Sequence, residues 1–442
     1  MDLTQGNIGR KILFFALPIM LSNLLQQFYN TADALIVGRF IGSDALAAIG
    51  ASSLLITFLI YFFIGLSSGA GVLIAQLFGA DCKKQLDIAV HTNIALALLS
   101  GVVLTIVGII FAKPMLQAMR IPESGIDYAK TYLQVYSAGM VPFTLYNIGS
   151  GILRALGDSK TPLYCLIITV TFNIILDIVF VVFMSWGVAG AAWASALSQL
   201  IAALFIIFKL RDLDEAFRLK IKSICFDLSM LKETVRIGVP MGIQSVLVCF
   251  SNVIVQTQIN AFGMHVMAGF TAYMKVEGFL FMPIDAFSIA IANYTGQNIG
   301  AGNMERVHKG KNICLVLSMG VTVAIEIVML LGARSIIGAF SSNEEVLSYG
   351  IQQIYFAVPL YFIYASNQTY IGVLRGAGAT FIPMIISLIC MCGLRIGWIL
   401  IFGKLIAEPF IIYISYPLTW IVTAAALFFY YHFGQWKTQL IV

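Results

Sequence analysis

Six ionisable side chains stand inside long apolar stretches of this sequence and are its clearest candidates for chemistry. A charged side chain at the centre of a bilayer costs about 2.5–3.5 kcal/mol on insertion scales, so a charge kept there indicates ion or substrate binding. The six are Asp33, Asp177, Glu277, Asp285, Glu326 and Arg395.

Asp33 and Asp177 are predicted to lie in the same half of the membrane. Asp33 follows Ile12 by 21 residues, about 31 Å along a helix, and Asp177 follows Pro162 by 15 residues, about 22 Å. Both helices enter from the same side, so both acids reach the far half. Ser195 lies about 12 Å into a run that enters from the other side, so it could meet them.

Helical spacing adds two further groups to these three. Asn173 precedes Asp177 by four residues and Ala191 precedes Ser195 by four, so each pair shares one helix face. Together with Asp33, they bring two carboxylates, an amide, a hydroxyl and a backbone carbonyl to one place. All are oxygen ligands suited to a hard cation, and the carboxylates could equally carry protons.

A second set of candidates suits the binding of an organic cation. Asp285 is predicted near the middle of its helix and Glu277 near its start, where a carboxylate facing a cavity would attract a cation. Tyr29 and Met282 belong to the aromatic and methionine side chains that could line a pliant cavity. The alternatives are pairing of the acids with Arg395 or a backbone group, and ordinary packing for the other two.

The composition explains why so few charges are available. Of the 442 residues, 60% are hydrophobic and 11% are charged, whereas soluble domains contain about 25% charged residues. This excludes an ordinary soluble protein and indicates that lipid is the solvent. The net charge of +5 forms no basic stripe, so we expect no nucleic-acid partner, and the seven cysteines lack metal-knuckle or disulfide spacing.

Twelve apolar runs are long enough to cross a bilayer core of about 30 Å as helices. Their approximate limits are 12–38, 46–78, 88–112, 125–150, 161–184, 187–209, 235–262, 275–298, 312–333, 346–373, 380–403 and 408–431. The longest polar break divides them into two sets of six. We therefore predict an amino-terminal lobe at 1–210, a cytoplasmic linker at 211–234 and a carboxy-terminal lobe at 235–442.

The basic residues predict the orientation. With the amino terminus inside, the even-numbered breaks and the termini contain eighteen Lys and Arg residues, and the odd-numbered breaks contain seven. The positive-inside rule then puts both termini in the cytoplasm. We expect a multi-pass protein of a prokaryotic plasma (inner) membrane, acting as a monomer and in contact with membrane lipid.

The sequence repeats itself at an offset of half its length. The offset pairs Gly151, Leu153, Arg154, Gly157 and Pro162 with Gly372, Leu374, Arg375, Gly378 and Pro383. Six spans per copy is an even number, so both copies cross the membrane in the same sense, related by a pseudo-two-fold axis along the membrane normal. This arrangement is typical of transporters that rock two bundles around a central site; the alternative is a duplicated scaffold without transport.

The repeat also provides a control for the acidic cluster. At the same offset, Asp33 matches Ile254, Asn173 matches Leu394 and Asp177 matches Trp398. A carboxylate kept only for folding would be expected in either copy. The asymmetry therefore favours an ion-binding function in the first lobe over a buried structural pair.

Pro18 precedes Asp33 by several turns in the same predicted helix. A proline inside a helix removes a backbone hydrogen bond and bends the axis, so a hinge is available there. The alternative is a static kink, because membrane helices tolerate proline well.

Several motifs resemble those of the multidrug and toxic compound extrusion (MATE) family, and together they extend over nearly the whole chain. They are A-L-P-I-M at the start, N-T-A-D-A-L-I-V-G-R-F-I-G at 30–42, Q-L-F-G-A at 76–80, G-I-L-R-A-L-G-D-S-K-T-P at 151–162, G-V-A-G-A-A-W-A-S at 187–195 and Q-N-I-G-A-G at 297–302. The resemblance implies an all-α integral membrane protein with twelve transmembrane helices in two six-helix lobes. It also implies extrusion of organic cations, including drugs, driven by inward H⁺ or Na⁺.

The resemblance, to the bacterial type with a cation site in the amino-terminal lobe, implies roles for the cluster. Asp33, Asn173 and Asp177 match the family's cation-coupling positions, with the carbonyl of Ala191 and the hydroxyl of Ser195, where threonine is also found. If Na⁺ is the coupling ion, the first three would be its side-chain ligands. The sequence does not distinguish Na⁺ from H⁺.

Two features of the family's pattern bear on the rest of the mechanism. In similar transporters the first helix bends at a proline when its aspartate changes protonation, which makes Pro18 the candidate hinge. The family's second site, a glutamate in the seventh span with an aspartate in the tenth, is missing here, so coupling through the second lobe is not expected from it.

Two other classes of function fit the sequence less well. An enzyme is not expected, because the sequence contains no H-E-x-x-H, G-x-S-x-G or G-x-G-D motif, and no cofactor is implied. A lipid- or saccharide-precursor flippase shares the superfamily fold and is the nearest alternative. It would favour a basic cavity for phosphate, whereas the spans of the first lobe contain acids and almost no base.

Overall fold

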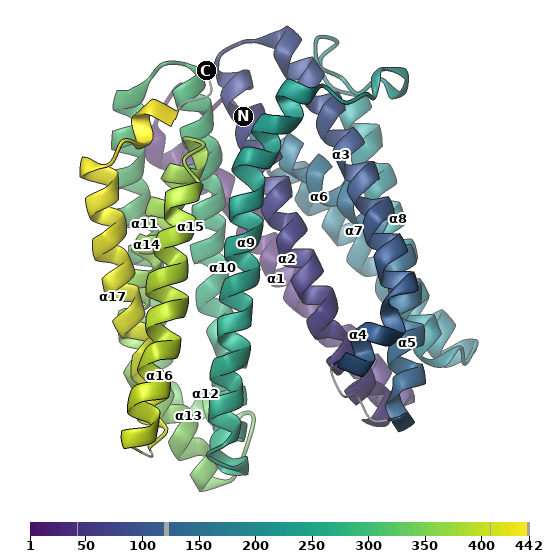
Figure 1. Cartoon of the computed structure of the whole chain (residues 1–442), viewed down its shortest axis with the longest axis vertical. Coiled ribbons are helices and arrows are strands. Elements are labelled where there is room, and N and C mark those ends of the chain that lie inside the picture. The colour runs from purple at the N-terminus through teal and green to yellow at the C-terminus, as the bar shows by residue number, and fades with distance from the viewer. Residues whose placement is uncertain (42, 119–122, 407, 440–442) are drawn as a thin grey trace. The chain divides into compact units, whose positions relative to one another are not determined.

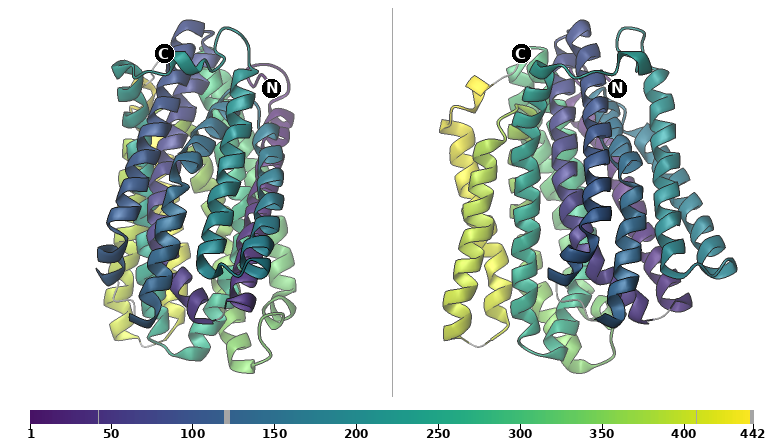
Figure 2. Two further views of the ribbon diagram at one scale, coloured as in Figure 1. Left: turned by 90° about the vertical axis from the view of Figure 1, so that its right-hand side faces the viewer. Right: turned by 45° about the vertical axis from the view of Figure 1, so that its right-hand side comes forward.

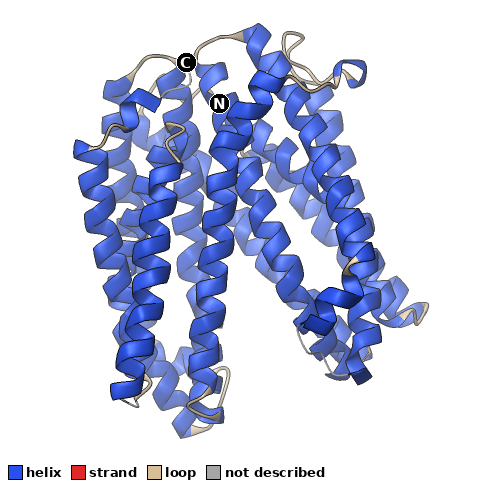
Figure 3. Cartoon of the chain, viewed as in Figure 1, coloured by secondary structure: helices blue, strands red, loops and turns tan. Residues whose placement is uncertain are grey.

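The computed structural model describes residues 1–41, 43–118, 123–406 and 408–439, and the only regular secondary structure in these ranges is helix (Figure 3). The first half of the chain forms eight α-helices and one π-helical stretch. They are α1 (Ile8–Phe40), α2 (Ser43–Gly79), α3 (Lys83–Ile110), α4 (Ala112–Ala118), α5 (Glu123–Ala138), α6 (Met140–Ala155), α7 (Lys160–Asp177), the π-helical η1 (Ile178–Phe183) and α8 (Gly187–Arg211).

The second half has a similar series of elements (Figure 1). They are the short η2 (Ile221–Ser223), α9 (Leu228–Asn260), α10 (Met264–Gly300), α11 (Met304–Leu331), α12 (Ala333–Gly338), α13 (Glu344–Ala357), η3 (Val358–Leu360), α14 (Tyr361–Gly376), α15 (Phe381–Ile386), the π-helical η4 (Ser387–Gly393), α16 (Leu394–Leu405), α17 (Phe410–Phe433) and η5 (Trp436–Gln439).

Eleven helical segments of the described chain are long and apolar enough to cross a membrane. The fourth predicted span is divided at Gly139 into α5 and α6, of 16 residues each, and each alone is shorter than the roughly 20 residues of a span. Together they are long enough. The prediction of an all-helical membrane protein is confirmed, with α5 and α6 forming one of its twelve spans.

The helix bounds repeat with the offset that the sequence predicts. Shifted along the chain by half its length, the first and last residues of α2, α3 and α6 coincide with those of α10, α11 and α14, respectively. The repeat therefore extends from sequence motifs to the positions at which helices start and stop.

The broken fourth span and its counterpart in the second half are stabilised from matching positions. A break leaves backbone groups unpaired, and lipid offers them no partner. Thr105 of α3 donates its hydroxyl to the carbonyl of Ser137 at 2.8 Å. At the matching position of α11, Glu326 accepts the amide of Phe362 at 2.7 Å. Glu326 is thus a buried cap for the amino-terminal end of α14, where the helix dipole favours a negative charge.

The chain forms two compact units, and two helices contribute to both. Unit 1 comprises Met1 and Leu21–Gly242, and unit 2 comprises Asp2–Met20 and Ile243–Val442. Helix α1 therefore changes unit after Met20, and α9 changes unit after Gly242.

Each of these two helices contains one interior proline, Pro18 in α1 and Pro240 in α9. Each proline lies two residues before the point at which its helix passes from one unit to the other. Since proline cannot donate the usual helical hydrogen bond, both helices are weakened at the same place relative to that point.

Unit 1 contains a close helix crossing between α2 and α9, built on glycines four residues apart. A Cβ atom at Gly65 would lie 2.2 Å from the backbone nitrogen of Gly242. One at Gly69 would lie 2.5 Å from the Cα of Gly238. The two backbones are therefore in direct contact, as small residues allow between membrane helices.

The segment between α8 and α9 is fastened to α3 within unit 1 (Figure 2). Nε2 of His91 accepts the backbone N–H of Lys220 at 3.0 Å, and the hydroxyl of Thr92 accepts that of Asp227 at 3.1 Å. Because a backbone N–H can only donate, Nε2 of His91 must be unprotonated in this contact.

Unit 2 is a helical bundle in which α10, α11, α14 and α17 pack side by side (Figure 1). Leu3 and Trp436 belong to the same buried cluster at one end of this unit. The described parts of the two chain ends therefore lie together in this unit.

Candidate cation site

Unit 1 brings the predicted cation-coupling residues together from three helices. The hydroxyls of Tyr29 on α1 and Ser195 on α8 are hydrogen-bonded at 3.0 Å. One turn further along α1, the half-buried Asp33 interacts electrostatically with Asp177 on α7. Asn173 is one turn before Asp177 and is fully buried with it, both being 0% exposed.

The polar atoms of this cluster are largely unpaired. Among the described residues, neither carboxylate oxygen of Asp177 and neither amide atom of Asn173 has a hydrogen-bond partner, and Oδ1 of Asp33 also lacks one. A buried polar atom left unpaired costs about 1–3 kcal/mol. A set of such atoms on two helices therefore indicates a site completed by a bound species that the chain itself does not supply.

The ligand types narrow the choice of that species. The unpaired groups are carboxylates and one amide, whose oxygens suit a hard cation, and either carboxylate can also hold a proton. In the described part of the chain, no group of three or more His, Cys, Asp or Glu side chains could hold a metal ion. The mixed set of two acids and an amide fits Na⁺ or H⁺ better than a transition metal.

The backbone next to Asp177 departs from regular α-helix. Helix α7 ends at Asp177, and the π-helical stretch η1 follows directly. A π-helical turn closes its hydrogen bonds five residues apart instead of four, and such turns are common at functional sites.

Two tyrosines of α5 complete the cluster and were missed in the sequence. The rings of Tyr132 and Tyr136 stack with centroids 5.8 Å apart, and both interact electrostatically with Asp33. Their spacing of four residues within one predicted span was the available signal. It carried too little information to distinguish them from other tyrosines in a chain with 18.

Ala191 lies among the buried residues beside this cluster. It is fully buried in a core group that also contains Tyr132 of α5 and Val37 of α1. The expected carbonyl of Ala191 is therefore in the same part of unit 1 as the acids.

The predicted substrate residues divide between the two units. Tyr29 belongs to the cluster of unit 1, whereas Glu277, Met282 and Asp285 lie on α10 in unit 2. Pro18, the predicted hinge, also belongs to unit 2, although Asp33 on the same helix belongs to unit 1.

Asp285 is exposed although its neighbours along α10 are buried. It interacts electrostatically with Arg375 of α14. A carboxylate facing lipid would be costly, so this exposed position indicates contact with water.

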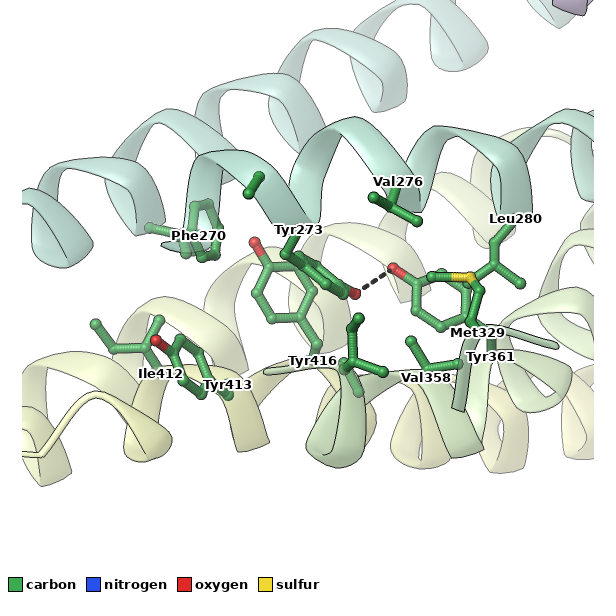
Figure 4. Packing of buried hydrophobic residues seen from close by; sticks show 14 of the residues in the cluster. Phe270, Tyr273, Val276, Leu280, Met329, Val358, Tyr361, Ile412, Tyr413 and Tyr416 are labelled. Carbon is green, nitrogen blue, oxygen red and sulfur yellow. Dashed lines mark hydrogen bonds between the residues drawn. The ribbon is translucent and has the colours of Figure 1, made fainter. Parts of the chain in front are cut away.

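Glu277, in contrast, is 4% exposed and accepts hydrogen bonds from the hydroxyls of Tyr273 and Tyr361. Figure 4 shows these two hydroxyls directed toward each other among apolar side chains. The two carboxylates of α10 therefore occupy opposite environments.

Comparison with known proteins gives consistent results. The family model MatE matches residues 18–179 and 240–400, two segments that each begin at one of the helix prolines. The chain is 29% identical over 446 residues to the probable multidrug resistance protein YpnP of Bacillus subtilis, across 99% of this chain and 98% of that protein. It is also 29% identical to the probable multidrug resistance protein NorM of Thermotoga maritima, across 88% of this chain and 84% of that protein.

A solved structure supports the fold. A solved structure described as the outward-facing conformation of a multidrug resistance MATE family transporter of the MOP superfamily superimposes with a TM-score of 0.92. The two chains are 22% identical, and the match covers 99% of this chain and 98% of the other.

Proposed function

The chain belongs to the MatE family of membrane transporters and is not an enzyme, and we propose that it is an antiporter that extrudes organic cations in exchange for H⁺ or Na⁺. The observation that carries the proposal is the set of unpaired acid and amide atoms around Asp177 in unit 1. The names of the multidrug resistance relatives support a drug-like substrate.

The coupling ion is bound by the cluster of unit 1. Asp33 and Asp177 carry the negative charge that attracts it, and Asn173 adds a neutral oxygen. The carbonyl of Ala191 and the hydroxyl of Ser195 complete the proposed set. If the ion is Na⁺, its side-chain ligands are Asp33, Asn173 and Asp177; if it is H⁺, one of the two carboxylates carries it.

Transport proceeds by alternating access of two lobes, 1–210 and 235–442, joined by 211–234. The repeated helix order supports two similar moving bodies. Pro18 acts as a hinge, supported by its place two residues before α1 changes compact unit. Both termini face the cytoplasm, supported by the distribution of basic residues, and the transporter acts as a monomer.

The exposed carboxylate of Asp285, with Met282 of the same helix in unit 2, is proposed to receive the organic cation. Tyr29 belongs to the cluster of unit 1 and is a separate candidate contact for the substrate. Asp285 interacts electrostatically with Arg375, so the site it offers is not strongly anionic. We expect bulky, singly charged cations to be preferred over small multivalent ones.

The test is transport of a fluorescent organic cation in proteoliposomes, with a pH gradient and a Na⁺ gradient imposed separately. Wild type is expected to respond to one of them, and Asp33→Asn to neither. Glu326→Gln is a matched control, because it removes a buried acid charge that caps a helix. If the wild-type protein is folded but transports no cation under either gradient, the proposed antiport is contradicted. That result would favour a flippase of a lipid or saccharide precursor.

A further inference from the structure

Unit 2 contains a buried polar cluster that the proposed transport mechanism does not use. At its centre is Glu277 on α10, 4% exposed, whose Oε1 accepts hydrogen bonds from the hydroxyls of Tyr273 and Tyr361. The two hydroxyls are also 3.1 Å from each other (Figure 4). With Oε1 of Glu277 they form a closed triangle.

A buried cation lies near this triangle without pairing with the acid. Arg395 on α16 is 3% exposed and donates to Asn252 at 3.2 Å and to Thr419 at 3.1 Å. Its guanidinium also sits 4.2 Å from the ring centre of Tyr416. It interacts electrostatically with Glu277, but no ion pair within 4.0 Å joins them in the described chain.

Among the described residues, the groups that face Glu277 come from four helices and include no second acid in direct contact. They are Tyr273 of α10, Tyr361 and Tyr364 of α14, Arg395 of α16 and Tyr416 of α17. The nearby Glu326 is already bonded to backbone amides at the start of α14. Hydroxyl donors and a guanidinium disfavour a metal cation, because they occupy the acceptor oxygen and repel positive charge.

The repeat shows that this cluster belongs to unit 2 alone. The positions of the first half that match Glu277, Tyr361 and Arg395 are Ile56, Met140 and Ile174, all apolar. A group kept for the common fold would be expected in both copies. The cluster therefore serves something that only the second half does.

We infer that Glu277 is a second proton-binding site of this protein, closed to metal ions and separate from the cation site of unit 1. In the proton-bound state the carboxyl group is neutral, and its burial among apolar side chains favours that form, while Oε1 accepts the two tyrosine hydroxyls. On release, the proton passes from its carboxyl oxygen to water, and the carboxylate left behind faces the positive charge of Arg395.

The position of Tyr361 gives the proton a structural effect. Tyr361 is the first residue of α14, directly after the short helical break η3. A change of charge on Glu277 alters its bond to the residue at which α14 begins. Tyr364, one turn later, lies in the electrostatic field of both Glu277 and the exposed Asp285.

The inference rests on the proposed antiport, because Glu277 would be a second proton-binding site used in that exchange. Its first test does not depend on transport. Infrared difference spectra of purified full-length protein at neutral pH, wild type against Glu277→Gln, should contain the carbonyl band of a protonated carboxyl group. Absence of that band would mean that Glu277 is ionised beside Arg395, and the inference would be overturned.

Hydroxyl deletions keep the test valid if Glu277→Gln does not fold. Tyr273→Phe and Tyr361→Phe each remove one hydrogen bond and should move the carbonyl band to higher frequency without removing it. Tyr413→Phe is the matched control, since Tyr413 is also buried and its hydroxyl has no partner among the described residues. An equal shift in the control, or none in the first two, would contradict the assigned hydrogen bonds.

Binding and transport assays on Glu277→Gln then distinguish a proton-binding role of Glu277 from direct contact with the substrate. Glu277→Gln should bind the fluorescent cation within about twofold of wild type, because its side chain is buried away from solvent. Its transport under a pH gradient should fall about tenfold, in the usual range of coupling free energies. Loss of cation binding would make Glu277 a substrate contact and overturn the inference. Failure of wild-type transport under both gradients would instead overturn the antiport, while the infrared band still decides the state of Glu277.

Discussion

The two compact units both hold acidic groups inside apolar helices, but they satisfy them in opposite ways. In unit 1 the oxygens of Asp177 have no hydrogen-bond partner among the described residues, and the nearby Asn173 is equally unpaired. In unit 2 Glu277 is bonded to two tyrosine hydroxyls with Arg395 nearby. An unpaired set favours a bound cation, whereas hydroxyl donors and a nearby guanidinium disfavour a metal cation.

The two clusters occupy neighbouring positions of the same repeated helix. Asn173 on α7 matches Leu394, and Arg395 on α16 matches Ile174. A π-helical stretch accompanies each, η1 directly after Asp177 and η4 directly before Leu394. Each half therefore has buried polar groups in the same region of the repeated helix, but the residue types differ: an acid and an amide in the first half, and an arginine in the second.

The largest effect is expected from removing a charge of the open cluster. Asp33→Asn or Asp177→Asn should lower gradient-driven transport about 100-fold, because a carboxylate that binds the coupling ion is lost. Glu326→Gln removes a buried acid outside both clusters. Its transport rate, per amount of folded protein, should stay within a few-fold of the wild-type rate. Equal losses in all three variants, measured in proteoliposomes, would mean that the acids of unit 1 have no special role.

The next effect concerns the helix crossing of unit 1. At the positions matching Gly65 and Gly69, unit 2 has Ala286 and Ala290, so Gly65→Ala introduces the residue that unit 2 tolerates. Its Cβ would lie 2.2 Å from the backbone of Gly242, so we expect a loss of about 1–3 kcal/mol in stability.

Thermal unfolding of the purified protein measures this loss. Gly320→Ala in α11 is the matched control, because its Cβ would meet nothing within 4 Å. An unchanged melting temperature for Gly65→Ala would contradict the direct backbone contact between α2 and α9.

A smaller effect is expected at the two helix prolines. Pro18→Ala restores a hydrogen bond where α1 changes unit, so transport should fall about tenfold if bending there is part of the cycle, a typical coupling energy. Pro240→Ala tests the matching place in α9. Rates of cation uptake for the two variants decide whether both helices act as hinges or only the one that carries Asp33. Unchanged uptake in both would make the prolines static kinks.

The smallest effect is expected at the broken spans. Glu326→Gln and Thr105→Val each remove one side chain that satisfies backbone groups at matching breaks. The first should cost about 1–2 kcal/mol, because a charged cap is weakened, and the second about 1 kcal/mol, because one neutral bond is lost. Thermal unfolding would contradict this assignment if Thr105→Val were the more damaging.

The sequence alone was sufficient for several conclusions. Hydropathy placed the spans, and eleven long helices match them, because burial in lipid requires each helix to be apolar along its own length. The repeat at half the chain length was readable because each half must form the same helices from its own residues. The absence of the acids from the second copy was visible for the same reason.

Only the tertiary structure decided which acids are paired. Glu277 meets Tyr361 across 84 residues of sequence, and Glu326 meets the amide of Phe362 across 36. Nothing in the spacing of these residues distinguishes them from Asp177, whose oxygens stay unpaired among the described residues. Hydrogen bonding between helices depends on how their faces are rotated and packed, and a one-dimensional pattern of apolar residues does not record that rotation. The span count was therefore a property of the sequence, whereas the difference between the two acidic clusters is a property of the fold.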